Sequence, residues 1–376
     1  MREHVGAYAD GFRKQADWCQ KLGSLFSADL LTQAADALQT GDNFVGRYMA
    51  WWQGTTAGDI SSDVIALRFL GCAHALALTG RVPELAAHYP SCGGDGVSGG
   101  LWSAVLSGFA AHEDFTRDFV LQPPQTNEVG RAGMLMPGLL ELARLVEMPV
   151  SLLEIGASAG LLQGLDRFHY TFGSTDYGDA TSPCHIEPQW HLPKVPPVDA
   201  SLEIAARRAC DFAPIDVTER RNADMLRSYI WADMAERLGR FDGALVIAQD
   251  VRPHVEQASA DLWLEDVLAE PATPGIARCV FHSVMWQYMP ADVQARAFAA
   301  ICKAGEAATQ NAPFAWLRFE PEANNKPMQL VLALWRGGAC EARQVAEGHP
   351  HGTQIGWYGW DEGAVLDGPA LVQSFS

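Results

Sequence analysis

The stretch VSLLEIGASAGLL, residues 150–162, constrains the fold of this chain more than any other. Its first six residues form a short, continuous apolar run, which is typical of a parallel strand buried on both faces. The turn that follows has the pattern E-x-G-x-S-x-G. Gly156 and Gly160 lack the Cβ atom that would keep a ligand away from the backbone. The stretch therefore predicts a buried strand that ends in a tight turn at the edge of a sheet.

The apolar pattern along the chain changes near this stretch. Residues 1–147 carry apolar side chains three to four positions apart nearly throughout, which predicts helices, among them 101–121 and 128–146. Beyond residue 150, short apolar runs alternate with helical segments, and a long loop is expected at 171–201. The expected strands are 150–155, 202–210, 243–249, 277–284, 314–320 and 328–335, and the expected helices are 222–238, 260–269 and 291–307.

This alternation predicts two domains of different class. We expect an all-α N-terminal domain, residues 1–147, and an α/β domain, residues 148–376, with a Rossmann-like, mostly parallel sheet. Only the polar loop PEANNKP separates the last two expected strands. The chain is therefore expected to end its sheet in an antiparallel hairpin.

Charge and cysteine usage exclude several classes of protein. The net charge is −18 at pH 7 and no run of five or more Lys or Arg residues offsets it, so we expect no nucleic-acid partner. The sequence has no 18-residue apolar segment and no apolar signal region near its start, so we expect no membrane span. None of the eight cysteines forms a C-x-x-C pair. We therefore expect reduced thiols in the cytoplasm and no metal site. The sequence does not indicate an oligomeric state.

The residues that flank the turn favour a ligand that carries both a positive and a negative charge. Glu154, at the end of the expected strand, can receive an ammonium group, and a helix beginning near Ala159 would offer N–H groups to a carboxylate. S-adenosylmethionine carries both groups, whereas the dinucleotide fingerprint G-x-G-x-x-G is absent from this turn. We therefore expect S-adenosylmethionine to contact Glu154, Gly156, Ser158 and Gly160. The alternative is a tight turn with a structural role alone.

Two further acids follow expected strands. Asp211 comes directly after 202–210, where a carboxylate can bind ribose hydroxyls. Asp261 precedes Leu262 and Trp263, so that the acid could bind the amino group of an adenine and the apolar side chains its ring face. The alternative for either acid is a turn or a helix cap.

The same turn also contains G-x-S-x-G, the pattern of a nucleophile elbow. In that interpretation Ser158 is the nucleophile, His282, His349 or His351 the base, and Asp250 the acid. Two features disfavour it, because the turn follows the first clear strand of the chain and no HGG-type oxyanion loop precedes it.

Nine segments spread over most of the chain carry a family resemblance. They are AAHYPS (86–91), QTNEVGRAGMLMPGLLELAR (125–144), LLEIGASAGLLQGLDRFHY (152–170), ARRACDFAPIDVT (206–218), LRSYIWADMAERLGRFDGAL (226–245), ADLWLEDVL (260–268), VFHSVMWQYMP (280–290), WLRFE (316–320) and PHGTQIGWYG (350–359). With these segments the chain resembles the domain of unknown function 2332 family, bacterial proteins with a helical N-terminal part and a region similar to class I methyltransferases. The resemblance implies a class I methyltransferase-type sheet that binds S-adenosylmethionine. It places Glu154, Gly156, Ser158 and Gly160 at the cofactor loop, Asp211 at the ribose and Asp261 near the adenine. Typical class I methyltransferases carry Gly where Ser158 stands.

The segment FHSVMWQYMP follows the strand expected at 277–284, so its residues should face the ligand. Methyl transfer needs in-line approach and often a base. His282 is the candidate base, and Tyr288 and Trp286 are expected to shape the site of the methyl acceptor. The alternative for His282 is a core histidine whose hydrogen bonds are all satisfied.

The segment QTNEVGR supplies a polar group near the end of the helical part. Asn127, Glu128 and Arg131 are expected to contact the substrate, since Asn127 and Arg131 share one helical face. The alternative is that Asn127 only caps the helix. Arg207 and Arg208 are expected to be ion-pair partners rather than an anion clamp.

We therefore predict a cytoplasmic S-adenosylmethionine-dependent methyltransferase that acts on a small molecule. A second hypothesis is a noncatalytic binding or regulatory protein on the same fold. The third is a serine hydrolase that uses Ser158.

Overall fold

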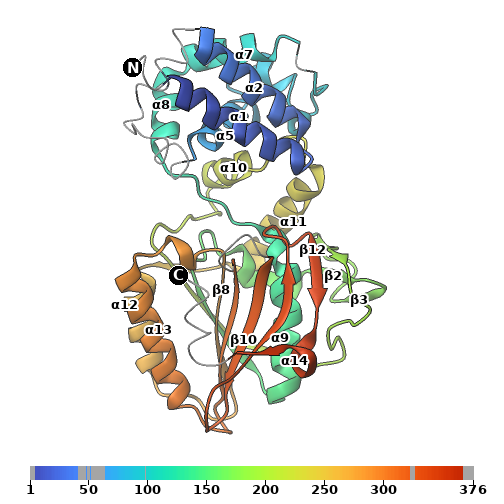
Figure 1. Ribbon diagram of the computed structural model, residues 1–376, viewed down its shortest axis with the longest axis vertical. Helices are drawn as coiled ribbons and strands as arrows, with labels where there is room; N and C mark the ends of the chain where they lie inside the picture. The colour runs from blue at the N-terminus through green and yellow to red at the C-terminus, as the bar shows by residue number, and fades with distance from the viewer. Residues whose placement is uncertain are drawn as a thin grey trace. The chain divides into compact units, whose positions relative to one another are not determined.

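The computed structural model describes residues 5–40, 48, 51, 64–97, 99–321 and 327–366. The chain forms two compact units (Figure 1). Unit 1 comprises Met1–Thr126 with Thr218–Gly239, and unit 2 comprises Asn127–Val217 with Arg240–Ser376. The boundary expected at residue 147 from the apolar pattern falls inside unit 2, because the helix before it packs on the sheet.

The regular elements described in unit 1 are helices that surround one apolar core. They are α1 (Val5–Lys21), α2 (Leu25–Thr40), α5 (Ile65–Leu78), α6 (Pro83–Ala86), η1 (Pro90–Cys92), α7 (Leu101–Ala111), α8 (Glu113–Leu121) and α10 (Arg220–Ser228). Helix α5 is buried along almost its whole length, as expected of a helix that is apolar on all sides. The ring of Tyr229, directly after α10, lies 2.8 Å from the Cβ position of Gly71 in α5. The single helix expected at 101–121 is wrong, because His112 leaves the helical conformation and its Nε2–H donates to the Arg81 carbonyl.

Unit 2 is built around one mixed sheet with the strand order β5-β12-β11-β10-β9-β8-β1-β6-β7. Its main strands are β1 (Val150–Ile155), β6 (Ile204–Asp211), β7 (Val255–Gln257), β8 (Ala277–Ser283), β9 (Phe314–Glu320), β10 (Met328–Trp335), β11 (Glu341–Gly348) and β12 (Gln354–Trp357), with β5 (Gln189–Trp190) and β13 (Ala364–Val365) at its margins. Strands β7, β6, β1, β8 and β9 are parallel, whereas β10, β11 and β12 follow as antiparallel neighbours. The expected mostly parallel α/β sheet and the hairpin of β9 and β10 are confirmed.

The order of the parallel strands reverses at β1. The chain first adds β6 and β7 on one side of β1 and then returns to add β8 and β9 on the other side. The carboxyl ends of β1 and β8 therefore flank a topological switch point, the place where open α/β sheets bind their ligands.

Helices cover both faces of this sheet (Figure 1). Helix α9 (Ala132–Val146) packs on one face, and α12 (Ala260–Ala269) and α13 (Ala291–Glu306) pack on the other. Successive side chains of β9 point to opposite faces of the sheet, because side chains alternate along a strand. Leu317 lies 2.6 Å from the Cβ position of Gly138 in α9, and the ring of Trp316 lies 5.9 Å from that of Phe298 in α13.

Two elements expected between 222 and 249 differ from the structure. The strand expected at 243–249 lies within helix α11 (Ala235–Val251). Its buried residues Phe241, Ala244, Ile247 and Ala248 follow helical spacing, and a short apolar run of this kind does not distinguish a strand from a buried helix. The helix expected at 222–238 is instead two helices, α10 and the first part of α11. The parallel strand that follows β6 in the chain is β7, not 243–249.

The crossover from β1 to β6 also differs from expectation. The helix expected after the turn is the 3-10 helix η3 (Leu161–Arg167). The loop expected at 171–201 contains β3 (Thr175–Tyr177) and β4 (His185–Ile186), which pair with β2 (His169–Phe172) in a small second sheet. None of the helices described in either unit has the length and apolarity needed to cross a bilayer.

The close packing of α13 on β10 gives a stability prediction. A Cβ atom at Gly305 would collide with the indole ring of Trp335. We expect Gly305→Ala to lower the free energy of unfolding by about 1–3 kcal/mol, because overpacking forces the ring or the helix to move.

Gly239 of α11 provides the matched control, since nothing lies within 4 Å of its Cβ position. Gly239→Ala should leave stability unchanged or raise it by about 0.5–1 kcal/mol. Thermal unfolding of both variants checks the pair. Equal melting temperatures would show that α13 and Trp335 are not in close contact.

Candidate functional site

The turn after β1 is a strained backbone segment held by the neighbouring strand. Gly156, Ser158 and Gly160 have φ of +68°, +54° and +71°, and only glycine adopts such angles at little cost. The Ser158 N–H donates to Oδ2 of Asp211 over 2.8 Å, and the other oxygen of Asp211 accepts the N–H of Ala213 over 2.9 Å. Three of the four residues predicted for the cofactor loop, Gly156, Ser158 and Gly160, thus lie in one turn, and Asp211, the residue predicted for the ribose, binds this turn.

Side chains cover both glycines of the turn. The Cβ position of Gly156 lies 2.7 Å from Cγ of Met285, and that of Gly160 lies 2.8 Å from Cβ of Pro253. A ligand that approaches Gly156 must therefore displace Met285. The flexible thioether chain of methionine makes this movement feasible.

Glu154 is buried in the protein and does not line the exposed surface of the turn. Its buried carboxyl accepts a hydrogen bond of 2.5 Å from Nε2 of Gln163 in η3. Burial above all, with the charge of Asp211 in addition, raises the pKa of Glu154 to about 8, although the bond from Gln163 opposes the shift. The acid predicted to receive an ammonium group is therefore largely protonated at neutral pH.

The turn after β8 has a similar construction. Val284, a β-branched residue, has φ of +53°. The carboxylate of Glu320, at the end of β9, accepts the N–H groups of Met285 and Trp286 over 3.1 and 3.3 Å. Both strands at the switch point thus end in a strained turn fixed by an acid of the next strand. Sequence reasoning missed Glu320, although its place at the end of an apolar strand could have pointed to it.

The ring nitrogens of His282 are both occupied. The indole N–H of Trp316 donates to Nε2 over 3.0 Å, and an indole has only a donor, so Nε2 carries a lone pair. Nδ1 therefore carries the hydrogen and donates it to Glu320 over 2.7 Å. The ring is buried and stacks on Trp286. His282 thus has the arrangement of a core histidine, whereas Tyr288 is 76% exposed.

The polar group of QTNEVGR lies in unit 2 and binds loops at the same edge of the sheet. Asn127 Oδ1 accepts the N–H of Leu161 over 2.9 Å and so caps η3 rather than the helix that follows it in sequence. Glu128 accepts a bond of 3.0 Å from Nδ1 of His351. Arg131 donates to the carbonyls of Ser283, over 3.2 Å, and of Pro350.

Asp261 is directed into the protein. Its buried carboxylate accepts hydrogen bonds from Ser259 and, over 2.7 Å, from Nε of Arg296. Burial alone would raise its pKa, but these two donors hold the pKa below its ordinary value. The next residue, Leu262, is 61% exposed.

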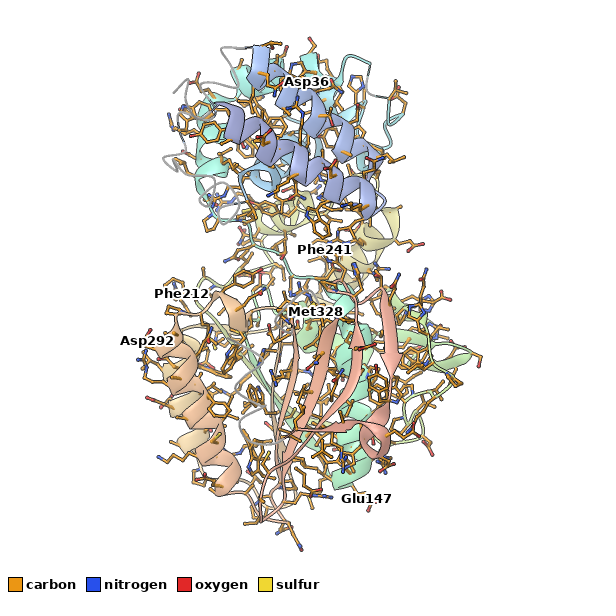
Figure 2. The ribbon with its side chains drawn as sticks, viewed as in Figure 1. Asp36, Glu147, Phe212, Phe241, Asp292 and Met328 are labelled. Atoms are coloured by element: carbon orange, nitrogen blue, oxygen red, sulfur yellow. The ribbon has the colours of Figure 1, made fainter. Side chains whose placement is uncertain are left out.

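Phe212 is a candidate site residue that sequence reasoning missed. It directly follows Asp211 at the end of β6 and is 81% exposed (Figure 2). An aromatic residue placed directly after a strand-terminal acid was the available signal. Phe212 and Leu262 thus present apolar surface after β6 and β7, the two strands on the Asp211 side of the switch point.

A cavity of about 520 Å³ opens at the same edge of the sheet, beyond β10, β11 and β12. Its walls are His191, Leu192, Pro327, Met328, Glu347, Gly348, His349, Pro350, Gln354, Gly356 and Tyr358. Burial and a hydrogen bond to Glu347 raise the pKa of Tyr358 to about 12. The volume suits a small molecule. Arg131 connects this cavity to the turn after β8, because it binds both Pro350 and Ser283.

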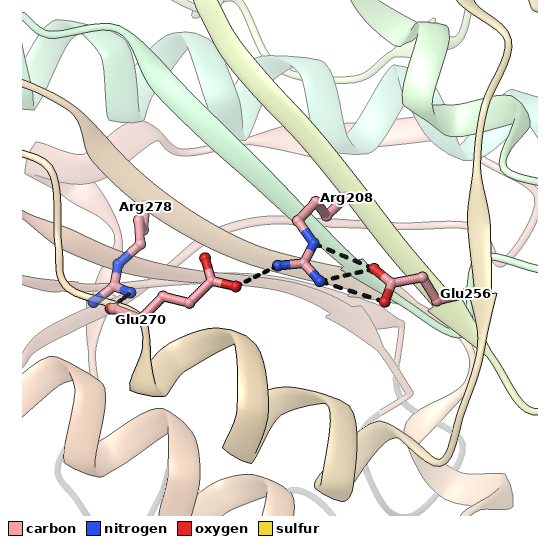
Figure 3. A network of polar contacts seen from close by, with 4 residues as sticks. All are labelled: Arg208, Glu256, Glu270 and Arg278. Atoms are coloured by element: carbon pink, nitrogen blue, oxygen red, sulfur yellow. Dashed lines mark hydrogen bonds and ion pairs between the residues drawn. The ribbon is translucent and has the colours of Figure 1, made fainter.

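The paired arginines of β6 are ion-pair partners, as expected. Arg208 contacts Glu256 over 3.0 Å and Glu270 over 2.8 Å, and the Glu270 carbonyl also binds Arg278 (Figure 3). Arg207 pairs with Asp166. Within the described part of the chain, no group of three or more His, Cys, Asp or Glu is arranged to hold a metal ion.

The fold is that of a mixed α/β protein with a mostly parallel sheet. At the switch point of this sheet, the carboxyl end of β1 leads into a turn that contains two glycines. The chain belongs to the DUF2332 family, described as an uncharacterized protein conserved in bacteria, whose model matches residues 9–357. The match covers most of both units. No curated protein matches the sequence significantly.

The raised pKa of Glu154 predicts how stability depends on pH. The carboxyl has an ordinary pKa of 4.5 in the unfolded chain and about 8 in the folded protein. The unfolded state therefore loses its proton first, and the wild type loses stability as the pH rises from about 4.5 to about 8. Glu154→Gln cannot ionise and keeps an oxygen that can accept from Gln163.

Relative to this variant, the free energy of unfolding of the wild type should fall by about 2–5 kcal/mol between pH 5 and pH 8 and change little above that range. Urea unfolding of both proteins at several pH values measures the difference. A difference that stays constant with pH would mean that Glu154 is ionised throughout.

Proposed function

We propose that this protein binds S-adenosylmethionine beyond the carboxyl ends of β1 and β6 and transfers its methyl group to a small molecule. The observation that carries the proposal is the contact between the Ser158 N–H and Asp211 at the switch point. It joins the glycine turn and the acid of the next strand, the two parts that an adenosyl group needs. Each oxygen of Asp211 uses one lone pair for a backbone N–H, which leaves the second lone pairs for ribose hydroxyls.

The exposed apolar residues support an adenine at this edge. Phe212 directly follows Asp211, and Leu262 follows β7, the neighbour of β6. A flat base gains free energy when it stacks on an aromatic ring. Asp261 is paired with Arg296, so we assign base binding to Phe212 and Leu262 and a supporting role to Asp261.

The turn itself supports the methionine part of the cofactor. The hydroxyl of Ser158 is buried and has no hydrogen-bond partner among the residues that the structure describes. Such groups in native proteins call for an explanation, and a bound ligand is one. The cofactor carboxylate would accept from this hydroxyl once Met285 moves away from Gly156.

The acceptor is proposed to enter this edge of the sheet from the side of the cavity of about 520 Å³ beyond β10 to β12 and to move from there to the turn after β8. Arg131 fixes one wall of this cavity to the end of β8. Because His282 has no available nitrogen, the favoured acceptor is a nucleophile that attacks without first losing a proton, such as a tertiary amine or a carboxylate.

A noncatalytic binding protein is the second candidate. The occupied nitrogens of His282 favour it, since they remove the base that sequence reasoning had selected. Nothing supports a hydrolase on Ser158, because its hydroxyl contacts no histidine in the described residues.

Binding of S-adenosylhomocysteine tests the cofactor site. At about 100 times its dissociation constant this ligand should add roughly 2.7 kcal/mol to the stability of the wild type. Phe212→Ala should weaken binding about tenfold or more, because stacking on an aromatic ring contributes about 1–3 kcal/mol. Phe212 is exposed, so its removal should not disturb the fold.

Val365→Ala is the matched control, because Val365 is also exposed but lies on β13, which pairs with the middle of β11. It should bind the ligand like the wild type. Titration calorimetry measures all three affinities. No binding by the wild type, or equal binding by Phe212→Ala, would contradict the proposal.

Turnover separates the enzyme from the binding protein. With S-adenosylmethionine and a panel of small amines and carboxylates, a methyltransferase should release S-adenosylhomocysteine at a rate that depends on the acceptor. Binding of S-adenosylhomocysteine without release from any acceptor would favour the noncatalytic protein.

A further inference from the structure

Unit 1 contains a serine and a histidine in direct contact. Ser91 lies in η1, and His74 lies in the middle of α5. The Oγ atom of Ser91 is 2.6 Å from Nε2 of His74. This is the distance at which a base can take the proton of a nucleophilic hydroxyl. Neither residue belongs to the site described in unit 2.

A carbonyl group fixes the direction of this hydrogen bond. The backbone carbonyl of Ser228, at the end of α10, lies 3.0 Å from Nδ1 of His74. A carbonyl only accepts, so Nδ1 carries the ring hydrogen and Nε2 carries a lone pair. The hydroxyl of Ser91 must therefore donate to His74. A serine, a histidine and a third group that orients the histidine form the arrangement of an activated nucleophile.

The surroundings hold the imidazole still and leave the serine accessible. His74 is buried and stacks on Tyr89, with ring centres 5.2 Å apart and planes 21° apart. Burial above all, with the charge of Arg227 in addition, lowers the pKa of His74 to about 4, although bonds to the carbonyls of Ser228 and Ile230 oppose the shift. The ring is therefore neutral at pH 7, with a lone pair on Nε2. Ser91 itself is only half-buried.

The chain beyond Ser91 is rich in glycine. Glycines occupy positions 93, 94, 96, 99 and 100. Gly93, Gly96 and Gly100 have positive φ. The segment after Ser91 is thus backbone-rich, as loops beside reactive groups often are.

We propose that Ser91 is the nucleophile and His74 the general base of an esterase site in unit 1, acting on small carboxylic esters. Oγ of Ser91 bonds to the ester carbonyl carbon while its proton passes to Nε2 of His74. The bond from that carbon to the alcohol oxygen then breaks, and the alcohol leaves with the proton from Nε2. Water attacks the acyl-serine, one water proton returns through Nε2 to Oγ, and the carboxylic acid is released. The sum of the steps is ester plus water giving acid plus alcohol.

A fluorophosphonate probe tests this site in the full-length protein. The probe should attach to Ser91 of the native wild type, as peptide mass spectrometry identifies, and not to heat-unfolded protein. Ser91→Ala should lose the label and the hydrolysis of p-nitrophenyl acetate. Ser103→Ala, an exposed serine of α7, is the matched control and should keep both. Ser91→Ala should bind S-adenosylhomocysteine like the wild type, so that this test is independent of the function proposed for unit 2.

His74→Asn tests the base. The amide of Asn can donate to the Ser228 carbonyl but cannot accept a proton from Ser91. Labelling should slow by about 100-fold or more, because general-base catalysis contributes roughly 100- to 10,000-fold. A native protein that is unlabelled or labelled elsewhere overturns the proposal, as does a folded His74→Asn variant that labels at the wild-type rate. If His74→Asn does not fold, the identity of the labelled serine in the wild type decides.

Discussion

The carboxylate of Asp211 is the contact on which the edge of the sheet in unit 2 depends. It binds the turn after β1 through Ser158 and its own loop through Ala213. A left-handed conformation costs a residue such as Ser158 roughly 1–2 kcal/mol. A hydrogen bond to a charged group contributes about 1.5–3 kcal/mol. The bond from Asp211 is therefore strong enough to offset the strain, so the turn can keep a shape that brings backbone N–H groups to the edge of the sheet.

Glu320 has the corresponding role on the other side of the switch point. Its buried carboxylate accepts from His282, Met285 and Trp286, and a buried charge is tolerated only with such donors. Burial also lowers the pKa of nearby Arg318 to about 10, although the charge of Glu320 opposes the shift. The two carboxylates come from the strands outside β1 and β8. Each binds the turn of its inner neighbour, so the two turns at the switch point are held by the same construction.

The sequence alone predicted the strands with long apolar runs and the place of Asp211. Strand β1 and the hairpin of β9 and β10 could be predicted because their residues are buried on both faces. The segment 243–249 could not, since its composition fits a buried helix equally well. The partners of His282 could not be predicted either, because Trp316 and Glu320 are 34 and 38 residues away in the chain. Exposure of Phe212 likewise depends on which segments pack around it.

The interrupted course of the chain through unit 1 has a consequence for biosynthesis. Residues up to 126 leave the ribosome long before 218–239, which complete the same unit. Until then α5 lacks Tyr229 beside Gly71, and His74 lacks the carbonyl of Ser228. At about 5–20 residues per second, the roughly 90 residues in between, 127–217, take about 5–20 s to translate. The nascent helices must remain unaggregated over this interval, while β1 and β6, made during the same delay, are already able to pair with each other.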